Sequence, residues 1–411
     1  NRMVSYFFIK KDIKDKKYLF ISRTSYLHKD KKNNIFIDRI FDHIFQKKNI
    51  SNYTTKIYLS EKIKINNLKF KGNLLFPFLT FLSNKNYGTT LETEKIIRKI
   101  AKEASINPNK LIKIFKLDLL NFNNWYNLGL KLFSNNTNIK KIFIACWYNP
   151  DAVGLICAAR NKGILIYDMQ HGFQGKYQAH YTDWSLIKKE GSKLLPNFFW
   201  CWNNITKKNI LNTSKSRKDN IPIVLGNDYF KYYKKNYLIK KNYYNKKIIL
   251  FSMQPLTDRN NILIPKFIKK YLSSIDFKDN LFIFRIHPND KSSKKELFDF
   301  VKKHKKHKQI IIDLSENNFL DAVEGCTHHI TAFSSTAIEA AYLNKKSAVF
   351  GEDSKLLYNE YIKSNYLQYL KGDYLNFIKW INLKNKKKRN FVNNQLFYAK
   401  PTYDKIFKYT K

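Results

Sequence analysis

Acidic residues, glycine, proline and cysteine are all scarce in this sequence. Its 411 residues include 32 Asp and Glu against 76 Lys and Arg, with 12 Gly, 9 Pro and 4 Cys. Sparse carboxylates, with no two aspartates two positions apart, argue against a hard-cation site, so we predict no metal and no cofactor. The cysteines lie far apart without a C-x-x-C pair, which favours buried thiols in a reducing cytoplasm over a zinc site. They are Cys146, Cys157, Cys201 and Cys326.

Long apolar runs are absent as well. No stretch of about 18 or more uncharged apolar residues occurs, so a membrane-spanning helix is not predicted. No signal-peptide pattern opens the chain, which favours a cytoplasmic protein. The chain begins Asn1-Arg2-Met3, which suggests either a tag scar before Met3 or excision from a longer protein.

Several motifs of nucleotide-binding and hydrolytic enzymes are also missing. The sequence has no G-x-G-x-x-G and no G-x-x-x-x-G-K-[ST], which disfavours dinucleotide and P-loop sites. H-E-x-x-H and G-x-S-x-G are absent too. Any bound phosphate would therefore depend on backbone N–H groups, hydroxyls, histidine and basic side chains.

Lysine, in contrast, is abundant and gives a formal net charge of +44. Only nine of the 76 basic residues are Arg, whereas a nucleic-acid surface favours arginine. The preferred interpretation is biased codon usage with a solvated lysine surface. A peripheral contact with the anionic inner membrane is the second interpretation. Nucleic acid is not predicted as a partner, because no binding-module motif occurs.

Short continuous apolar runs alternate with helical patterns along most of the chain. Strands buried on both faces of a parallel sheet have this appearance, so we predict an α/β fold with doubly wound sheets. The strands are expected at Tyr18–Ser22, Lys56–Leu59, Lys141–Cys146, Ile164–Tyr167, Phe198–Trp202, Pro222–Leu225, Lys247–Ser252, Leu281–Arg285, Gln309–Asp313, His329–Phe333 and Ser347–Phe350. Helices are expected at Leu91–Ala104, Ala152–Lys162, Pro265–Ser273, Lys294–His304 and Ser335–Leu343.

The alternation pauses across Asn227–Lys246, a stretch of Lys, Tyr and Asn that we interpret as an interdomain linker. The prediction is therefore two Rossmann-like domains, residues 1–235 and 236–411, facing each other across a cleft. Because ligands of such sheets bind outside the carboxyl ends of the strands, the cleft is the expected active site.

The strongest candidate site is the segment Thr331–Ala341. A strand there ends near three hydroxyl residues, Ser334, Ser335 and Thr336, and a helix of small and apolar residues follows. Hydroxyls and free N–H groups at such a helix start can hold a phosphate. The plain alternative is a helix cap without ligand. Glu339, one turn into the helix, could accept hydrogen bonds from a ribose or sugar hydroxyl.

Two further strand ends carry polar side chains. Arg285 and His287 stand two positions apart, and Pro288 follows His287. In an extended strand their side chains would point the same way, where a positive charge and a proton donor suit a leaving phosphate. In the first half, Asp168 and His171 follow a buried strand, and either could remove a proton from an acceptor hydroxyl. A structural histidine and an Asx turn are the plain alternatives.

Gln254 and Glu316 are weaker binding candidates because each stands just after an expected strand of the second half. Gln254 is then expected to face the cleft, and Glu316 could touch a base or ribose. Together with Arg285, His287, Pro288, Ser334, Ser335, Thr336 and Glu339, they make up the predicted ligand-binding set.

The motifs, in order, resemble a known group of enzymes. They are DMQHG, FFWCWN followed by IPIVLGN, IILFSMQP, FRIHP and TAFSSTAIEAAYLNKKSAVFGE. Roughly from Lys141 to Glu352 the chain resembles bacterial surface-polysaccharide glycosyltransferases of the two-domain GT-B fold. Capsule Kdo transferases, HP-motif sialyltransferases and CDP-glycerol glycerophosphotransferases are the nearest in pattern. The resemblance implies that His287 and the Ser334–Thr336 hydroxyls hold the donor's phosphates and that Asp168 or His171 is the base.

The resemblance implies a metal-independent glycosyltransferase for capsule or lipooligosaccharide. Its donor would be a nucleotide sugar, with a cytidine nucleotide such as a CMP-ulosonic acid favoured over a UDP-sugar. Its acceptor would be a hydroxyl of an oligosaccharide or lipid-linked glycan. The alternatives are a nucleotide-sugar 2-epimerase on the same fold and a non-catalytic scaffold at the membrane surface.

Overall fold

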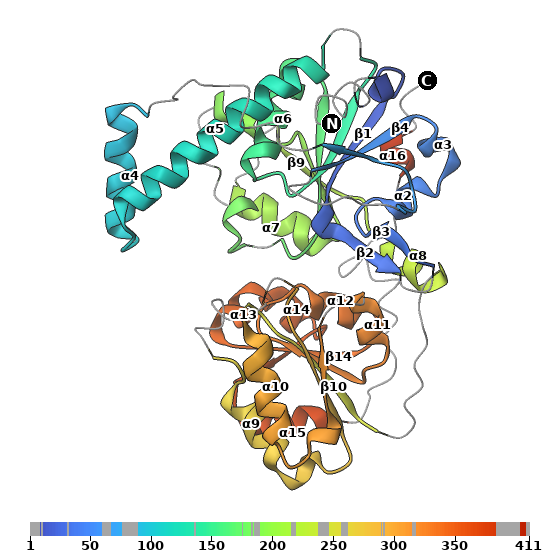
Figure 1. Ribbon diagram of the computed structural model, residues 1–411, viewed down its shortest axis with the longest axis vertical. Coiled ribbons are helices and arrows are strands. Elements are labelled where there is room, and N and C mark those ends of the chain that lie inside the picture. The colour runs from blue at the N-terminus through green and yellow to red at the C-terminus, as the bar shows by residue number, and fades with distance from the viewer. Residues whose placement is uncertain are drawn as a thin grey trace.

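The computed structural model comprises two α/β domains, one built around each of two parallel sheets (Figure 1). It describes residues 9, 11–30, 33–59, 67–75, 89–134, 137–174, 176–181, 184, 190–214, 219–236, 246–255, 262–288, 290, 292–314, 318–383 and 403–407. Within these residues, no helix combines the length and the hydropathy needed to cross a bilayer.

The first domain has a seven-stranded sheet in the order β5-β4-β1-β6-β7-β8-β9, and every pairing is parallel. Its strands are β1 (Tyr18–Arg23), β4 (Thr54–Leu59), β5 (Asn73–Leu75), β6 (Lys141–Ala145), β7 (Leu165–Met169), β8 (Phe198–Cys201) and β9 (Ile221–Val224). Every residue of β4 and β6 is buried because helices cover both faces of the sheet.

The helices of this domain differ in how they meet the sheet. They are α2 (Asp42–Phe45), α3 (Lys48–Ser51), α4 (Leu91–Glu103), α5 (Pro108–Leu132), α6 (Pro150–Asn161), α7 (Asn204–Ser214) and α8 (Tyr229–Asn236). Helix α5 packs on α6 so tightly that a Cβ on Gly154 would stand 2.5 Å from the Phe122 carbonyl oxygen. Helix α4 and the outer half of α5 project from the domain (Figure 1).

A small antiparallel hairpin, β2 (Leu27–Asp30) and β3 (Ile35–Asp38), stands apart from the sheet. Asn34, in its turn, has a φ of 51°, a conformation that asparagine tolerates. Ile37 of the hairpin is buried in a hydrophobic cluster shared with the second domain. The hairpin therefore belongs to the boundary between the domains.

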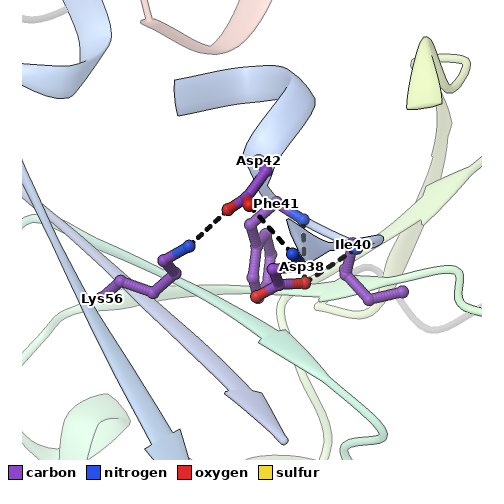
Figure 2. A network of polar contacts seen from close by, with 5 residues as sticks. All are labelled: Asp38, Ile40, Phe41, Asp42 and Lys56. Atoms are coloured by element: carbon purple, nitrogen blue, oxygen red, sulfur yellow. Dashed lines mark hydrogen bonds and ion pairs between the residues drawn. The ribbon is translucent and has the colours of Figure 1, made fainter. Parts of the chain in front are cut away.

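The turn after β3 is held by a buried polar network (Figure 2). The Asp38 carboxylate accepts hydrogen bonds from the N–H groups of Ile40 and Phe41 at 2.9 and 3.3 Å. The Asp42 carboxylate accepts one from the Asp38 N–H at 2.9 Å and also pairs with the Lys56 ammonium on β4. Lys56 is only 1% exposed, so this ion pair is cut off from water.

The second domain has a six-stranded parallel sheet in the order β12-β11-β10-β13-β14-β15. Its strands are β10 (Ile248–Ser252), β11 (Leu281–Arg285), β12 (Ile310–Asp313), β13 (His328–Thr331), β14 (Lys346–Phe350) and β15 (Gln368–Leu370). Its helices are α9 (Lys266–Ser273), α10 (Ser293–Lys303), α11 (Phe319–Glu324), α12 (Thr336–Tyr342), α13 (Glu352–Leu357), α14 (Asn359–Lys363) and α15 (Tyr374–Asn382). The predicted fold class, two doubly wound domains, is confirmed.

Short 3₁₀ helices are also present among the described elements. They are η1 (Thr24–Tyr26), η2 (Ala179–Tyr181), η4 (Glu190–Leu194), η6 (Ile275–Phe277) and η7 (His307–Gln309).

The predicted linker Asn227–Lys246 contains a helix in its first half. Residues Tyr229–Asn236 form α8, which buries four aromatic side chains against the second domain and the hairpin: Tyr229, Phe230, Tyr232 and Tyr233. Residues 237–245 lie outside the described part of the chain. A division between residues 235 and 236 stays a prediction.

The last described helix, α16 (Asp404–Phe407), packs on the first domain. The Phe407 ring lies 5.0 Å from that of Tyr18 on β1, and the Lys141 ammonium donates to the Ile406 carbonyl oxygen. Residues 403–407 thus contact the first sheet, although they come after the second sheet in the chain.

Candidate functional site

A pocket of about 350 Å³, including the part open to solvent, lies between the two domains. Both domains contribute side chains that follow the carboxyl ends of strands, as expected for a ligand site in this kind of fold. The first domain supplies His28, Arg39, Ile40, His171, Trp202, Asn227, Tyr229 and Phe230. The second supplies Asn318, Phe319, Leu320 and Glu339.

Two of the polar pocket residues come from the hairpin and are not among the sequence-based candidates. His28 lies on β2, and Arg39 directly follows β3. Burial and the charges of Arg39 and Arg285 lower the pKa of His28 to about 3, so its ring is neutral at pH 7. The only local signal for this hairpin is Asn33-Asn34 between two short apolar segments.

The loop after β7 contacts the second domain. The Gln170 side chain fixes it by accepting from the Trp202 N–H at 2.7 Å and donating to the Gly172 carbonyl oxygen at 2.9 Å. The next residue, Phe173, packs 4.8 Å from the Tyr358 ring of α14's N-terminal flank. A Cβ on Gly172 would stand 3.6 Å from the Ser335 hydroxyl oxygen, so the two domains nearly touch there.

The two candidate bases, Asp168 and His171, have different surroundings. Asp168 is 1% exposed, and its carboxylate accepts from the Tyr181 hydroxyl at 2.9 Å and the Gln174 amide at 3.4 Å. Burial raises its pKa well above the usual value. Asp168 does not line the pocket, whereas His171 does. The role of either residue as a base stays a prediction.

His171 is held beside a positive charge. Its carbonyl oxygen accepts from the Arg39 guanidinium at 3.0 Å, and its ring lies 5.4 Å from that of Tyr26. Burial, then the charge of Arg39, lowers the pKa of His171 to about 4, while the Met169 backbone acts the other way. The ring is therefore uncharged at neutral pH.

The predicted hydroxyl segment lies at the start of α12, on the second-domain side of the boundary. The Thr336 N–H donates to the Ser334 hydroxyl oxygen at 3.4 Å, and Ser335 makes no side-chain cap to the helix. All three hydroxyl residues are half-buried. Glu339 lines the pocket, and burial raises its pKa against the opposing charges of Arg39 and Arg285.

That Arg285 and His287 point the same way stays a prediction. Strand β11 ends at Arg285, and the Ile286 N–H still bonds the Asp313 carbonyl oxygen at 2.9 Å. The Arg285 guanidinium pairs with the Asp313 carboxylate and lies 5.9 Å from the ring centroid of Phe319, a pocket residue. His287 is half-buried and Pro288 is exposed in a turn, and neither lines the pocket.

Gln254 belongs to a buried network inside the second sheet rather than to the pocket wall. Its amide donates to the Thr331 hydroxyl at 3.4 Å. Beside it, the Ser252 hydroxyl bonds the His329 ring at 3.0 Å, and the other ring nitrogen bonds the Ser347 hydroxyl at 3.2 Å. Glu316 lies outside the described residues.

These three side chains, Ser252, His329 and Ser347, form what we call the imidazole ladder. Ser347 donates to the Ala337 carbonyl oxygen of α12 at 2.9 Å, so it accepts from the His329 ring, whose other nitrogen accepts from Ser252. Both ring nitrogens are satisfied in the neutral form. Burial lowers the pKa of His329 to about 3.

The pocket has the chemistry of an anion and hydroxyl site. It combines one arginine, two uncharged imidazoles and one carboxyl with the aromatic walls of Trp202 and Phe319. Over the part of the chain that the structure describes, no three His, Cys, Asp or Glu side chains are grouped as metal ligands.

Comparisons with known proteins support the fold. No protein-family model and no curated protein sequence matches the chain. The UDP-GlcNAc 2-epimerase of Methanocaldococcus jannaschii is similar in structure, with a TM-score of 0.56, 13% identity, and coverage of 95% of this chain and 98% of that one. A putative UDP-N-acetylglucosamine 2-epimerase of Listeria monocytogenes is similar too, with a TM-score of 0.55, 10% identity, and coverage of 93% of this chain and 92% of that one.

The UDP-GlcNAc 2-epimerase of Neisseria meningitidis bound to UDP-GlcNAc is also similar, with a TM-score of 0.53, 11% identity and coverage of 88% and 90%. The chain has the two-domain, GT-B-like fold of these enzymes. At such low identity the similarity establishes the fold alone.

Proposed function

We propose that the protein is an enzyme that binds a nucleotide sugar in the pocket between its domains and acts at the sugar ring. One observation carries the proposal: a pocket between two Rossmann-like domains is lined by an arginine and an imidazole of the β2–β3 hairpin, a second imidazole that follows β7, and a buried carboxyl of α12. A nucleotide sugar presents an anion to be held and a proton to be moved. Arg39 suits the first task, and His171 and Glu339 suit the second.

The first candidate reaction is inversion at carbon 2 of a UDP-N-acetylhexosamine. It is favoured because similar structures that span nearly the whole chain are UDP-GlcNAc 2-epimerases. In such a reaction one group takes the proton of carbon 2 while the bond from carbon 1 to the phosphate oxygen breaks with its electron pair, which leaves a double bond between carbons 1 and 2. A second group then returns a proton to the other face of carbon 2 as the phosphate oxygen, or water, bonds carbon 1. His171 and Glu339 are the two pocket residues we propose for this exchange.

The second candidate is glycosyl transfer, favoured by the shortage of carboxylates. Glu339 is the single carboxyl among the described residues that line the pocket, whereas transfer needs only one base and an anion clamp. The acceptor oxygen would bond the anomeric carbon while the bond from that carbon to the phosphate oxygen breaks with its electron pair. The hydroxyl proton would pass to His171, whose pKa a bound phosphate raises from about 4 toward neutrality.

Neither Ser335 nor His287 lines the pocket, so for either reaction we propose that the phosphates extend beyond it, to the Ser335 hydroxyl and the His287 ring, with Arg285 nearby. Losing a contact that strengthens in the transition state typically costs ~3–4 kcal/mol of activation free energy. We therefore expect His287→Ala to lower turnover strongly without unfolding the protein. Turnover equal to that of the unsubstituted enzyme would remove His287 from the mechanism.

The test is incubation with UDP-GlcNAc, UDP-ManNAc or a CMP-ulosonic acid, with and without an oligosaccharide acceptor, followed by NMR. An epimerase converts the UDP-hexosamine without acceptor, either to the C2 epimer or to free ManNAc and UDP. A transferase releases nucleotide only when acceptor is present and forms a new glycosidic bond. Absence of turnover, together with absence of thermal stabilisation by CMP, CDP, UDP and GDP, would leave the non-catalytic scaffold.

If transfer is the reaction, we propose a lipid-linked or capsular acceptor and a peripheral contact with anionic membrane. Helices α4 and α5, which project from the first domain (Figure 1), support this. Ile96, Ile100 and Ile114 are exposed on them among lysines. Co-sedimentation with vesicles of phosphatidylglycerol and phosphatidylcholine tests it. Binding should be lost for Ile96→Ser/Ile100→Ser and for pure phosphatidylcholine vesicles, and equal binding by that variant would contradict it.

A further inference from the structure

Arg39 carries a charge that no carboxylate neutralises within 4 Å among the described residues. One Nη donates to the His171 carbonyl oxygen at 3.0 Å, and the guanidinium carbon lies 5.3 Å from the Tyr26 ring centroid. Its Nε is buried without a hydrogen-bond partner. A guanidinium offers five N–H donors, so most of its capacity is unused.

The groups around Arg39 do not supply the missing negative charge. His28 and His171 are uncharged at neutral pH, as their lowered pKa values of about 3 and about 4 require. Glu339 lines the pocket with Arg39 and is affected by its charge, yet no ion pair within 4 Å joins the two. A partly desolvated charge without a counterion is unfavourable, and a bound anion would relieve that cost.

The backbone around Arg39 is held in place by buried polar contacts. The network of Asp38, Asp42 and Lys56 holds the turn that carries it (Figure 2). Because that turn is anchored to strand β4 of the first sheet, little conformational freedom is lost when the guanidinium meets a ligand. An anchored fork of donors binds an oxyanion more tightly than a free one.

Arg39 lies at the boundary between the two domains. Arg39 bonds the carbonyl of His171, and the next residue, Gly172, faces Ser335 across the boundary. From these observations we propose that Arg39 binds an oxyanion of the ligand from the first-domain side. Resting on the proposed function, this anion is a phosphate of the nucleotide sugar, and a carboxylate on the sugar is the other source of the same chemistry.

The test compares Arg39→Gln with the unsubstituted protein by calorimetric titration of pyrophosphate, UDP, UDP-N-acetylglucosamine and UDP-glucuronic acid. Loss of one charge-assisted fork predicts roughly 10- to 100-fold weaker binding. A loss for all four ligands assigns the phosphate, whereas a loss confined to UDP-glucuronic acid assigns the sugar carboxylate. Arg98→Gln, on the projecting helix α4, is the matched control and should bind like the unsubstituted protein.

Equal affinities of Arg39→Gln and the unsubstituted protein for every ligand would overturn the proposal while leaving the nucleotide-sugar function standing. Conversely, pyrophosphate binding that depends on Arg39 without any nucleotide binding would retain the anion site and remove the proposed function. A readout without substitution guards against misfolding: pyrophosphate should protect Arg39, but not Arg98, from phenylglyoxal in mass spectra. Equal modification of Arg39 with and without pyrophosphate would contradict the assignment.

Discussion

Behind the first-domain wall of the pocket lies an ion pair, whereas behind the second-domain wall lies the neutral imidazole ladder. The first-domain wall is supported by the ion pair of Lys56 and Asp42, and both side chains are buried. The second-domain wall is supported by His329, which bonds the hydroxyls of Ser252 and Ser347, and Ser347 in turn bonds the backbone of α12. The ion pair holds the turn that carries Arg39, and the imidazole ladder holds the start of α12. Both of these segments face the same pocket.

The two devices differ in what disturbs them. Removing one partner of a buried ion pair leaves an uncompensated charge, which is far more costly than the pair itself is stabilising. The ladder contains no charge, but its histidine resists protonation, so acid disturbs it. We therefore expect the first wall to be sensitive to substitution and the second to be sensitive to pH.

The largest effect is expected for Lys56→Met. Methionine keeps the apolar stem but strands the Asp42 carboxylate in the interior, where burial already raises its pKa. The free energy of unfolding should fall by ~3–5 kcal/mol at neutral pH. Urea denaturation followed by circular dichroism measures this.

The matched control is Lys116→Met, because the Lys116–Glu94 pair at 2.9 Å lies on the exposed helices α4 and α5. Pairs of that kind contribute little, so no measurable change is expected. Similar losses in both variants would mean that burial of the Lys56 pair has no special weight. Lys56→Met should also weaken pyrophosphate binding, since it loosens the turn that carries Arg39.

An intermediate effect is expected for His329→Asn, read as a pH dependence. The folded-state pKa of about 3 is below the usual 6.5, so the unfolded chain binds a proton that the native ladder excludes. This contribution to stability is present above pH 6.5 and is lost as the pH falls toward 3. Removing the imidazole should therefore flatten the fall in unfolding free energy by up to ~1.4 kcal/mol per pH unit.

Urea titrations between neutral and acidic pH measure that slope. His307→Asn is the control, because His307 is exposed on η7 and its loss should leave the slope unchanged. Parallel pH profiles for His329→Asn and the unsubstituted protein would show that His329 takes up its proton in the native state.

The second wall could largely be predicted from sequence. Its strands are continuous apolar runs, and the expected strands from Lys247–Ser252 to Ser347–Phe350 all coincide with elements of the sheet. The rule that ligands bind at carboxyl strand ends then places Ser335 and Glu339 near the pocket. The edge strand β15 was missed because three residues give too short a pattern.

The first wall could not be predicted in the same way. His28 and Arg39 belong to a hairpin outside the sheet, and only its packing against the second domain brings them to the pocket. Asp168, expected just after a strand, lies inside β7, whereas His171 lies two residues beyond its end, and no local pattern shows where this strand stops. Helix α8 was hidden by its Lys and Tyr composition, although its aromatic residues recur at helical spacing.

The smallest effect on stability is expected where the walls meet, for Gly172→Ala. A Cβ there would stand 3.6 Å from the Ser335 hydroxyl oxygen, an ordinary contact, so unfolding free energy should change by less than about 0.5 kcal/mol. Its methyl group nevertheless enters the gap between the domains, and UDP affinity in calorimetry should fall several-fold. Gly163→Ala is the opposite control: its φ of 70° penalises alanine by roughly 1 kcal/mol, yet UDP affinity should not change. If Gly172→Ala binds UDP normally, the ligand does not occupy the space between Gly172 and Ser335, and the two walls grip it elsewhere.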